Sequence, residues 1–290
     1  MKISVPIVNA FIDGHGGGNP AGVVLDGNTF THDQKQRIAA GVGFSETAFV
    51  SPSTLADYKL EFFTPTRQIA HCGHATIATF SYMKQLGMLT GDQTSKETID
   101  GRREIRMEGE SAFMEQSAPR YTDLSQAEQR RAMASIGMSA SDLLKGASPC
   151  IVNTGNSFLL IALHHQQAVN ALVPRHTEIA SLSDAYNLIG YYVFSPQTVK
   201  EGRDAGARMF APRYGIEEES ATGMAAGPLA CYLHDTLGIN QDTFTIEQGY
   251  LMPRPSPSVI SVRLHKSKGS ISSLMVGGLA AVSKIMQVEC

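Results

Sequence analysis

The feature that most constrains the fold of this chain is a local repeat. Residues 63–65 read Phe-Thr-Pro and precede a loop and then Gly73-His74-Ala75, which opens a helical stretch. The order returns as Phe-Ala-Pro at 210–212, a loop and Gly223-Met224-Ala225, with the two glycines 150 residues apart. The repeat predicts an α+β fold of two similar domains related by a pseudo-twofold axis, each a curled, mostly antiparallel sheet around one central helix.

The helix pattern agrees with that arrangement. Residues 74–87 carry Ile77, Phe80, Met83 and Leu86 at helical spacing, and Gly87 is typical of a helix end. The second copy is an alanine-rich helix that ends near Leu237. Apolar, β-branched runs at 3–12 and 21–25 predict strands at the start of the chain.

Two capping boxes mark further helices. Thr31 with Gln34 predicts a helix to about residue 41, and Ser125 with Glu128 predicts one to about residue 136. The length of 290 residues fits two domains. We expect them at 1–118 and 119–275, with 276–290 returning to the first domain and the active site in the cleft between them.

Composition excludes several classes of partner. Lys and Arg number 24 against 27 Asp and Glu, so the formal charge of −3 gives no basic surface for nucleic acid. The longest apolar runs, such as 158–163, are too short to span a membrane. The four cysteines are far apart and form no C-x-x-C pair, which predicts a reduced, cytoplasmic protein.

The repeat also predicts a binding site for an anion. Two loop-to-helix junctions, at Gly73 and Gly223, would face one cleft, each with unpaired amides and the positive end of a helix dipole. A small carboxylate-bearing molecule is the expected ligand. Pro228 lacks an amide hydrogen, so we expect it to delay the regular helix by about one turn.

Nucleotide and metal sites find little support in the residues. Gly16, Gly18 and Ala21 match a dinucleotide fingerprint in form, but a strand-like run follows them instead of a helix. His71, Cys72 and His74 are crowded into four positions, without the usual spacing of zinc ligands. We therefore expect no cofactor and no metal.

Cys72 leaves one alternative open. A cysteine at a helix N-terminus is acidified and could act on a Cα proton, as in a cysteine-dependent racemase or epimerase. That chemistry needs a thiol on both faces of the substrate, and the repeat places Thr222 opposite Cys72. A buried structural cysteine is the preferred interpretation.

Ordered motifs along nearly the whole chain resemble the PhzF-like (phenazine biosynthesis) family, relatives of diaminopimelate epimerase that lack its cysteine pair. The matching segments are GNPAGVVLD (18–26), GFSETAFV (43–50), FFTPTRQIAHCGHAT (62–76), NTGNSFLLI (153–161), RMFAPRYGIEEESATGMAAGPLA (208–230), EQGYLMPRPS (247–256) and VGG (276–278). The resemblance implies a two-domain diaminopimelate epimerase-like fold, a homodimer without cofactor, and an isomerase that moves a proton between substrate carbons.

Site residues follow from that resemblance. Glu46 corresponds to the family's general acid/base, and His74 to a group that contacts the substrate. Glu46 is a lone acid between apolar segments, and burial of a carboxyl group favours its protonated form, so it could exchange protons near neutral pH. The expected substrate-binding residues are His74, Gly73, Ala75, Glu219, Thr222, Gly223 and Met224.

Three departures from the family pattern put the substrate in doubt. Glu219 stands where an aspartate is usual, Met224 where a serine is usual, and Asn9 where an aspartate is common. Met224 cannot replace the hydroxyl hydrogen bond and it narrows the pocket. The substrate is therefore expected to differ from the phenazine precursor, and a non-catalytic small-molecule binding protein on the same scaffold remains the alternative.

Overall fold

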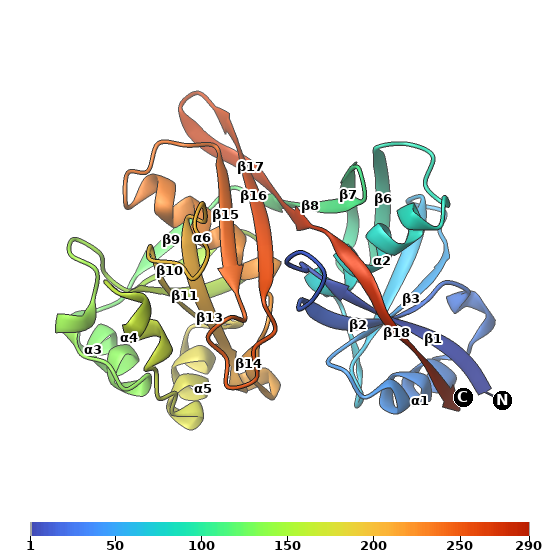
Figure 1. Ribbon diagram of the computed structural model, residues 1–290, viewed down its shortest axis with the longest axis horizontal. Helices are drawn as coiled ribbons and strands as arrows, with labels where there is room; N and C mark the ends of the chain where they lie inside the picture. The colour runs from blue at the N-terminus through green and yellow to red at the C-terminus, as the bar shows by residue number, and fades with distance from the viewer. Residues whose placement is uncertain (1, 290) are drawn as a thin grey trace. The chain divides into compact units, whose positions relative to one another are not determined.

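The computed structural model describes residues 2–289 (Figure 1). The chain forms two compact units. The N-terminal unit holds the described residues up to Glu115 and those from Gly277 onward, and the C-terminal unit holds Gln116–Val276. In Figure 1 the red C-terminal strand β18 (Ala280–Glu289) lies beside the blue β1 (Lys2–Ala10), so the N-terminal unit is built from both ends of the chain.

The sheet of the N-terminal unit is mixed but mostly antiparallel. Antiparallel pairs join β18 to β1, β1 to β2, β3 to β4, β4 to β5, β6 to β7 and β7 to β8, whereas β2 and β3, and β4 and β6, are parallel. The further strands are β2 (Asn19–Val24), β3 (Thr47–Pro52), β4 (Tyr58–Phe63), β5 (Gln68–Ile69), β6 (Gln93–Thr98), β7 (Gly101–Glu108) and β8 (Ser111–Ser117).

The C-terminal unit repeats this topology strand for strand. Antiparallel pairs join β9 to β10, β10 to β11, β12 to β13, β13 to β14 and β15 to β16, whereas β11 and β12, and β13 and β15, are parallel. The strands are β9 (Arg120–Asp123), β10 (Cys150–Asn153), β11 (Ser157–Ala162), β12 (Gly190–Ser195), β13 (Ala205–Ala211), β14 (Ile216–Glu219), β15 (Thr243–Gln248), β16 (Ser258–Ser267) and β17 (Ser270–Gly278).

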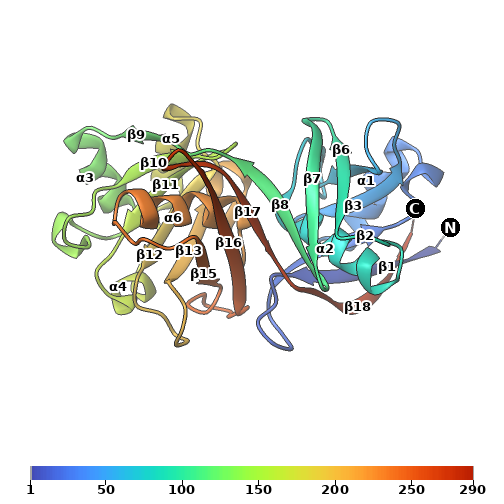
Figure 2. The same ribbon diagram turned by 90° about the horizontal axis from the view of Figure 1, so that it is seen from above.

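Each unit encloses one central helix, α2 (Gly73–Gln85) or α6 (Gly223–Asp235). Both helices are buried along most of their length, and α2 contacts β1, β2, β3 and β18. Figure 2 shows α2 and α6 each among the strands of its own unit. The expected α+β class, with a curled sheet around a central helix, is confirmed.

Peripheral helices cover the outer faces of the sheets. They are α1 (His32–Val42), α3 (Gln126–Ser135), α4 (Gln166–Asn170) and α5 (His176–Ala185), with short 3₁₀ turns η1 (Gly27–Thr29), η2 (Ala140–Asp142) and η3 (Pro212–Tyr214). Both expected capping boxes are present: Thr31 with Gln34 begins α1, and Ser125 with Glu128 begins α3. Local capping chemistry therefore sets these helix starts.

Two local predictions were wrong. Pro228 lies inside α6 without delaying it, since the amides of Ala225 and Ala226 already bond to the Thr222 carbonyl. Burial of nearly all of α6 outweighs the local cost of the proline. The sequence near the end of the chain also predicts one strand over 273–283, but the structure has two strands there, β17 and β18, which belong largely to different units.

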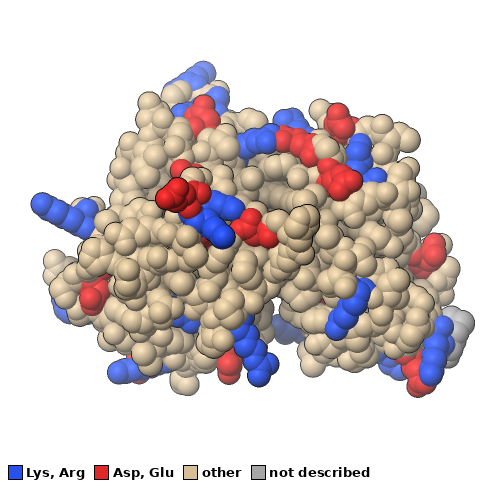
Figure 3. Space-filling view, viewed as in Figure 1, with Lys and Arg blue, Asp and Glu red and all other residues tan. Residues whose placement is uncertain are grey.

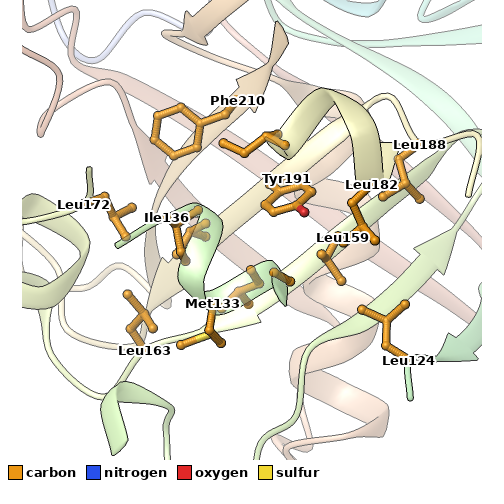
Figure 4. Packing of buried hydrophobic residues seen from close by; sticks show 14 of the residues in the cluster. Leu124, Met133, Ile136, Leu159, Leu163, Leu172, Leu182, Leu188, Tyr191 and Phe210 are labelled. Atoms are coloured by element: carbon orange, nitrogen blue, oxygen red, sulfur yellow. The ribbon is translucent and has the colours of Figure 1, made fainter. Parts of the chain in front are cut away.

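Each unit has its own apolar core. In the C-terminal unit α3 and α5 pack on the sheet through Met133, Ile136 and Leu182 against Leu159 and Tyr191 (Figure 4). In the N-terminal unit α1 packs on β1, β3 and β18, with Ile38, Ile7, Phe49 and Val288 among the buried residues. The core of the N-terminal unit thus includes the last strand of the chain.

The surface carries both signs of charge. On the face drawn in Figure 3, Lys and Arg side chains are interspersed with Asp and Glu, and no large patch has a single sign. Within residues 2–289 no helix has the length and apolar character needed to cross a bilayer.

Candidate active site

Sheet topology places Glu46 next to the start of α2. Glu46 immediately precedes β3, and Thr47 pairs with Phe63 at the end of β4, the strand that leads through β5 into α2. The Glu46 carbonyl accepts a hydrogen bond of 3.1 Å from the Gly22 amide, which fixes the backbone at this point. The carboxylate therefore lies at the edge of the sheet where the central helix begins.

Glu46 contacts His74 through its carboxylate. Oε2 of Glu46 lies 3.2 Å from Nε2 of His74, and the two residues are only 8% and 5% exposed. The contact brings the two buried polar side chains within ion-pair distance of each other. His74 thus orients the carboxylate that the sequence marks as the general acid/base.

The other ring nitrogen of His74 faces Cys72. Its Nδ1 lies 3.6 Å from Sγ of Cys72, which is also buried. The three side chains form a row in the order Cys72, His74, Glu46, here called the Cys72–His74–Glu46 row. A thiol, an imidazole and a carboxylate in this order can share and relay protons.

The row is not arranged as a preformed metal site, although one thiol, one imidazole and one carboxylate ligand atom lie within 4.8 Å of one another. Cys72 approaches Nδ1 of His74 and Glu46 approaches Nε2, whereas a metal ion takes a single ring nitrogen. The absence of a metal stays a prediction.

The helix start supplies the electrostatic part of the site. Cys72 is the N-cap residue of α2 in extended conformation, and the Thr76 amide is bonded to its carbonyl. The amides of Gly73, His74 and Ala75 stand in the first turn, where a helix offers them no carbonyl partner and its dipole favours an anion.

The equivalent place in the C-terminal unit has different chemistry. Thr222 and Met224 occupy the positions of Cys72 and His74 in the repeat, so α6 begins without a thiol or an imidazole. Oγ1 of Thr222 donates a 2.5 Å hydrogen bond to Glu219 at the end of β14. Asn156 Nδ2 lies 4.0 Å from the Met224 sulfur. Among the described residues, the α6 start therefore has no counterpart of the Cys72–His74–Glu46 row.

Gln248, a residue to which the sequence assigned no role, hydrogen-bonds to several groups around the start of α6. Gln248 Oε1 accepts hydrogen bonds from the Thr222 amide (3.0 Å) and from the Tyr192 hydroxyl (2.9 Å). Its Nε2 donates to the carbonyl of Glu219 (2.6 Å) and to the hydroxyl of Thr222 (3.2 Å). Burial raises the pKa of Tyr192, so this phenol stays a neutral donor. Gln248 lies within the family-like segment 247–256, but no residue pattern there assigned it a role.

Asn9 has a structural explanation. Its Nδ2 donates a 2.7 Å hydrogen bond to the carbonyl of Gly17 in the glycine-rich loop. An aspartate could not donate this bond. Next to it, Gly18 has φ of +84°, and a Cβ there would stand 2.6 Å from the carbonyl oxygen of Ala10, so this position requires glycine.

Comparison with known proteins gives the family. Residues 8–285 match the family model described as phenazine biosynthesis-like protein. The chain belongs to the phenazine biosynthesis-like (PhzC-PhzF) family. An uncharacterized isomerase of Deinococcus radiodurans is 30% identical over 96% of this chain and 92% of its own length. Trans-2,3-dihydro-3-hydroxyanthranilate isomerase of Pseudomonas chlororaphis is 32% identical over 86% of this chain and 87% of its own.

Solved structures agree with this family assignment. A PhzF-family protein of Bacillus anthracis superimposes with a TM-score of 0.91, 26% identity and full coverage of both chains. A hydroxyproline epimerase of Agrobacterium vitis shares the fold alone, with a TM-score of 0.60 and 13% identity over 99% of this chain and 92% of its own. Family membership and the isomerase names of the relatives identify the chain as an isomerase.

Proposed function

We propose that the chain is a cofactor-independent isomerase that moves a proton between carbons of a small carboxylate-bearing substrate, with Glu46 as the proton shuttle. The observation that carries the proposal is the contact of 3.2 Å between the buried Glu46 carboxylate and Nε2 of His74. It places the carboxylate of Glu46, which lies in the family-like segment 43–50, against a single partner side chain. Pre-organised bases of this kind are what carbon acid chemistry requires.

In the proposed reaction, residues of this chain remove a proton, stabilise the resulting negative charge and return the proton. The Glu46 carboxylate takes a proton from a substrate carbon, and the electron pair delocalises toward the substrate's carboxylate. The amides at the start of α2 stabilise that negative charge. Glu46 then returns the proton to a different carbon, so the bonds and charges balance without an external reagent.

Glu219, Thr222, Gly223 and Met224 are proposed to bind the same substrate. The support for this is the repeat, in which α6 begins at Gly223 as α2 begins at Gly73, although the Ala225 amide is bonded to the Thr222 carbonyl. Glu219 and Met224 differ from the usual family residues, so the proposal leaves the substrate open. Trans-2,3-dihydro-3-hydroxyanthranilate, the substrate in the name of one relative, and trans-4-hydroxy-L-proline, bound to one structural neighbour, are the first probes.

The test is carbon-bound deuterium uptake from D₂O, followed by mass spectrometry on a panel of small carboxylates that includes both probes. Glu46→Gln keeps the volume but cannot carry a proton, so we expect exchange to fall by about 10²- to 10⁴-fold. Glu104→Gln, an exposed change on β7, is the matched control and should leave exchange unchanged. Undiminished exchange in Glu46→Gln would remove the proposed role of Glu46.

A thiol mechanism is the second candidate, because Cys72 lies 3.6 Å from a ring nitrogen that could accept its proton. Cys72→Ser separates the two. The proposed mechanism predicts that this variant keeps most of its exchange activity and stays sensitive to Glu46→Gln. A racemase based on Cys72 predicts loss of exchange in Cys72→Ser and protection of the parent protein from thiol reagents by substrate.

A further inference from the structure

Lys96 is a buried amine that the proposed reaction does not use. It lies in β6, and its side chain is 0% exposed, among the largest fully buried side chains of the described chain. Lysine is almost never fully buried unless it is paired. The groups that Lys96 contacts are a hydroxyl, an imidazole and an aromatic ring.

The hydroxyl connects Lys96 to the start of α2. Nζ donates a 2.6 Å hydrogen bond to Oγ1 of Thr76, and Oγ1 in turn donates a 2.6 Å hydrogen bond to the carbonyl of Cys72. Cys72 is the N-cap residue of the helix. A chain of two buried hydrogen bonds therefore runs from the amine to the residue that begins the row.

The remaining contacts leave the amine without a strong counter-charge. Nζ lies 3.4 Å from Nδ1 of His71 and 5.2 Å from the centre of the Phe62 ring. Burial, with Lys96 and Arg103 next, holds the pKa of His71 well below its ordinary value, so the imidazole is neutral and can accept the bond. A buried cation in such surroundings destabilises the fold unless an opposite charge nearby compensates for the loss of its hydration.

The opposite charge that interacts with Lys96 most strongly is that of Cys72. Burial lowers the pKa of Lys96 to about 7, and the largest opposing effect comes from the charge of Cys72; Arg103 lowers the pKa further and Asp100 raises it. The attraction is mutual, so an ammonium at Lys96 favours the thiolate of Cys72 as the thiolate favours the ammonium. Charge at Lys96 therefore affects where the protons of the Cys72–His74–Glu46 row reside.

We propose that Lys96 is a positioning residue of this active site: it holds the first turn of α2 through Thr76 and favours the thiolate of Cys72 beside His74. The proposal rests on the proposed function for its effect on turnover. Lys96 itself touches no substrate, because its side chain is fully buried behind the helix start. Its effect on Cys72 can be measured without any substrate.

The first measurement is the pH titration of thiolate absorbance at 240 nm, taken as the difference between each protein and its Cys72→Ser counterpart. Burial raises the pKa values of Cys150 and Cys231 to about 11 and about 12, so these two cysteines contribute little thiolate absorbance near pH 7. Lys96→Met replaces the amine with a neutral chain of similar length. Removing a nearby opposite charge should lower the thiolate-to-thiol ratio of Cys72 at pH 7 by about tenfold or more.

Two comparison variants make the result specific. Lys96→Arg keeps the charge and should restore the ratio at least in part, whereas Lys59→Met on the neighbouring β4 should leave it unchanged. An unchanged ratio in folded Lys96→Met, or an equal change in Lys59→Met, overturns the proposal. If Lys96→Met does not fold, Lys96→Gln provides the same neutral substitution with a polar end.

The second measurement is deuterium exchange into substrate, with KM and kcat determined separately. Because Cys72→Ser keeps most of the exchange activity under the proposed function, the effect of Lys96 on turnover must act through its hydrogen bond to Thr76 and the first turn of α2. Lys96→Met should therefore lower kcat by about tenfold with little change in KM, and Lys96→Arg, which can still donate to Thr76, should recover part of the loss. Unchanged kcat in Lys96→Met overturns the positioning role even when the titration has shifted. Failure of the proposed function is a separate result, since it shows as full exchange in Glu46→Gln whatever Lys96 does.

Discussion

At the scale of single residues, the candidate site contains side chains proposed to take part in proton transfer and a side chain proposed to position them. Glu46 and His74 are in direct contact, and Cys72 completes the row from the other side of the imidazole. Lys96 lies behind them and reaches the row only through Thr76 and through its charge. A family motif can reveal the first group, whereas the second depends on burial, which no local pattern displays.

The buried lysine predicts how stability depends on pH. The pKa of Lys96 is about 7 in the folded chain and near its ordinary 10.5 when unfolded. Between these values the unfolded chain binds a proton that the folded chain lacks, so stability rises with pH by up to about 1.4 kcal/mol per unit. Below about pH 7 both states are protonated, and the contribution of Lys96 is at its least favourable.

Urea unfolding of the parent chain and of Lys96→Met at pH 6, 7, 8 and 9 tests this. The free energy of unfolding of the parent, minus that of the variant, should be flat below about pH 7 and increase from pH 7 to pH 9. Taking the difference cancels the titrating groups that do not interact with Lys96. A difference that stays constant over this range contradicts a lowered pKa of Lys96.

The elements owe their functional positions to strand pairing. The strands β4 and β13 each pair with a short antiparallel strand near one end and with a parallel strand near the other. For β4 these partners are β5 and β6, and for β13 they are β14 and β15. The short strand leads into the central helix in each case. This arrangement delivers the helix start to the sheet end where Glu46, or Gln248 in the second unit, is located.

Gln248 should be the critical support of the α6 start. Gln248→Leu leaves the Thr222 amide, the Tyr192 hydroxyl and the Glu219 carbonyl without their partner, and each buried unsatisfied group costs about 1–3 kcal/mol. We expect a loss of about 3 kcal/mol or more in the free energy of unfolding by urea. Gln287→Leu, exposed on β18, should change it by less than about 0.5 kcal/mol. Similar losses in the two variants would contradict the support role.

At the scale of the whole molecule, the N-terminal unit depends on β18, a strand far from the rest of that unit in the sequence. β18 pairs with β1 from Lys2 to Ala10, and Val288 belongs to the core beneath α1. Closing this pairing joins segments at opposite ends of the sequence, which is slow and entropically costly before the rest of the unit has formed.

A chain that ends at Leu279 tests this dependence. Without β18 the β1 edge is unpaired and the α1 core is open, so amides of α1 should lose their protection in hydrogen exchange measured by mass spectrometry. Amides of α5 and β12 in the C-terminal unit should keep theirs, because their core contains no residue beyond Phe210 among its fully buried members. Equal protection of α1 in both chains would show that β18 is dispensable.

Much of this architecture was accessible from the sequence. The repeat predicted one central helix in each half, the capping residues predicted the starts of α1 and α3, and the ordered motifs indicated the family and singled out Glu46 and His74. These signals are local, since caps, helical spacing and motifs each span a few consecutive residues. Identification of the PhzF family needed nothing beyond them.

Tertiary structure alone decided which groups meet. The contact between Glu46 and His74, the order of the Cys72–His74–Glu46 row, and the burial of Lys96 and Gln248 all depend on strand pairings between distant segments. The same holds for Pro228, whose local cost is outweighed by the packing of α6. Sequence sets local conformational preference, whereas burial and pairing arise from the sum of long-range contacts, so a polar residue in a short strand has no signal of its own until the sheet has formed.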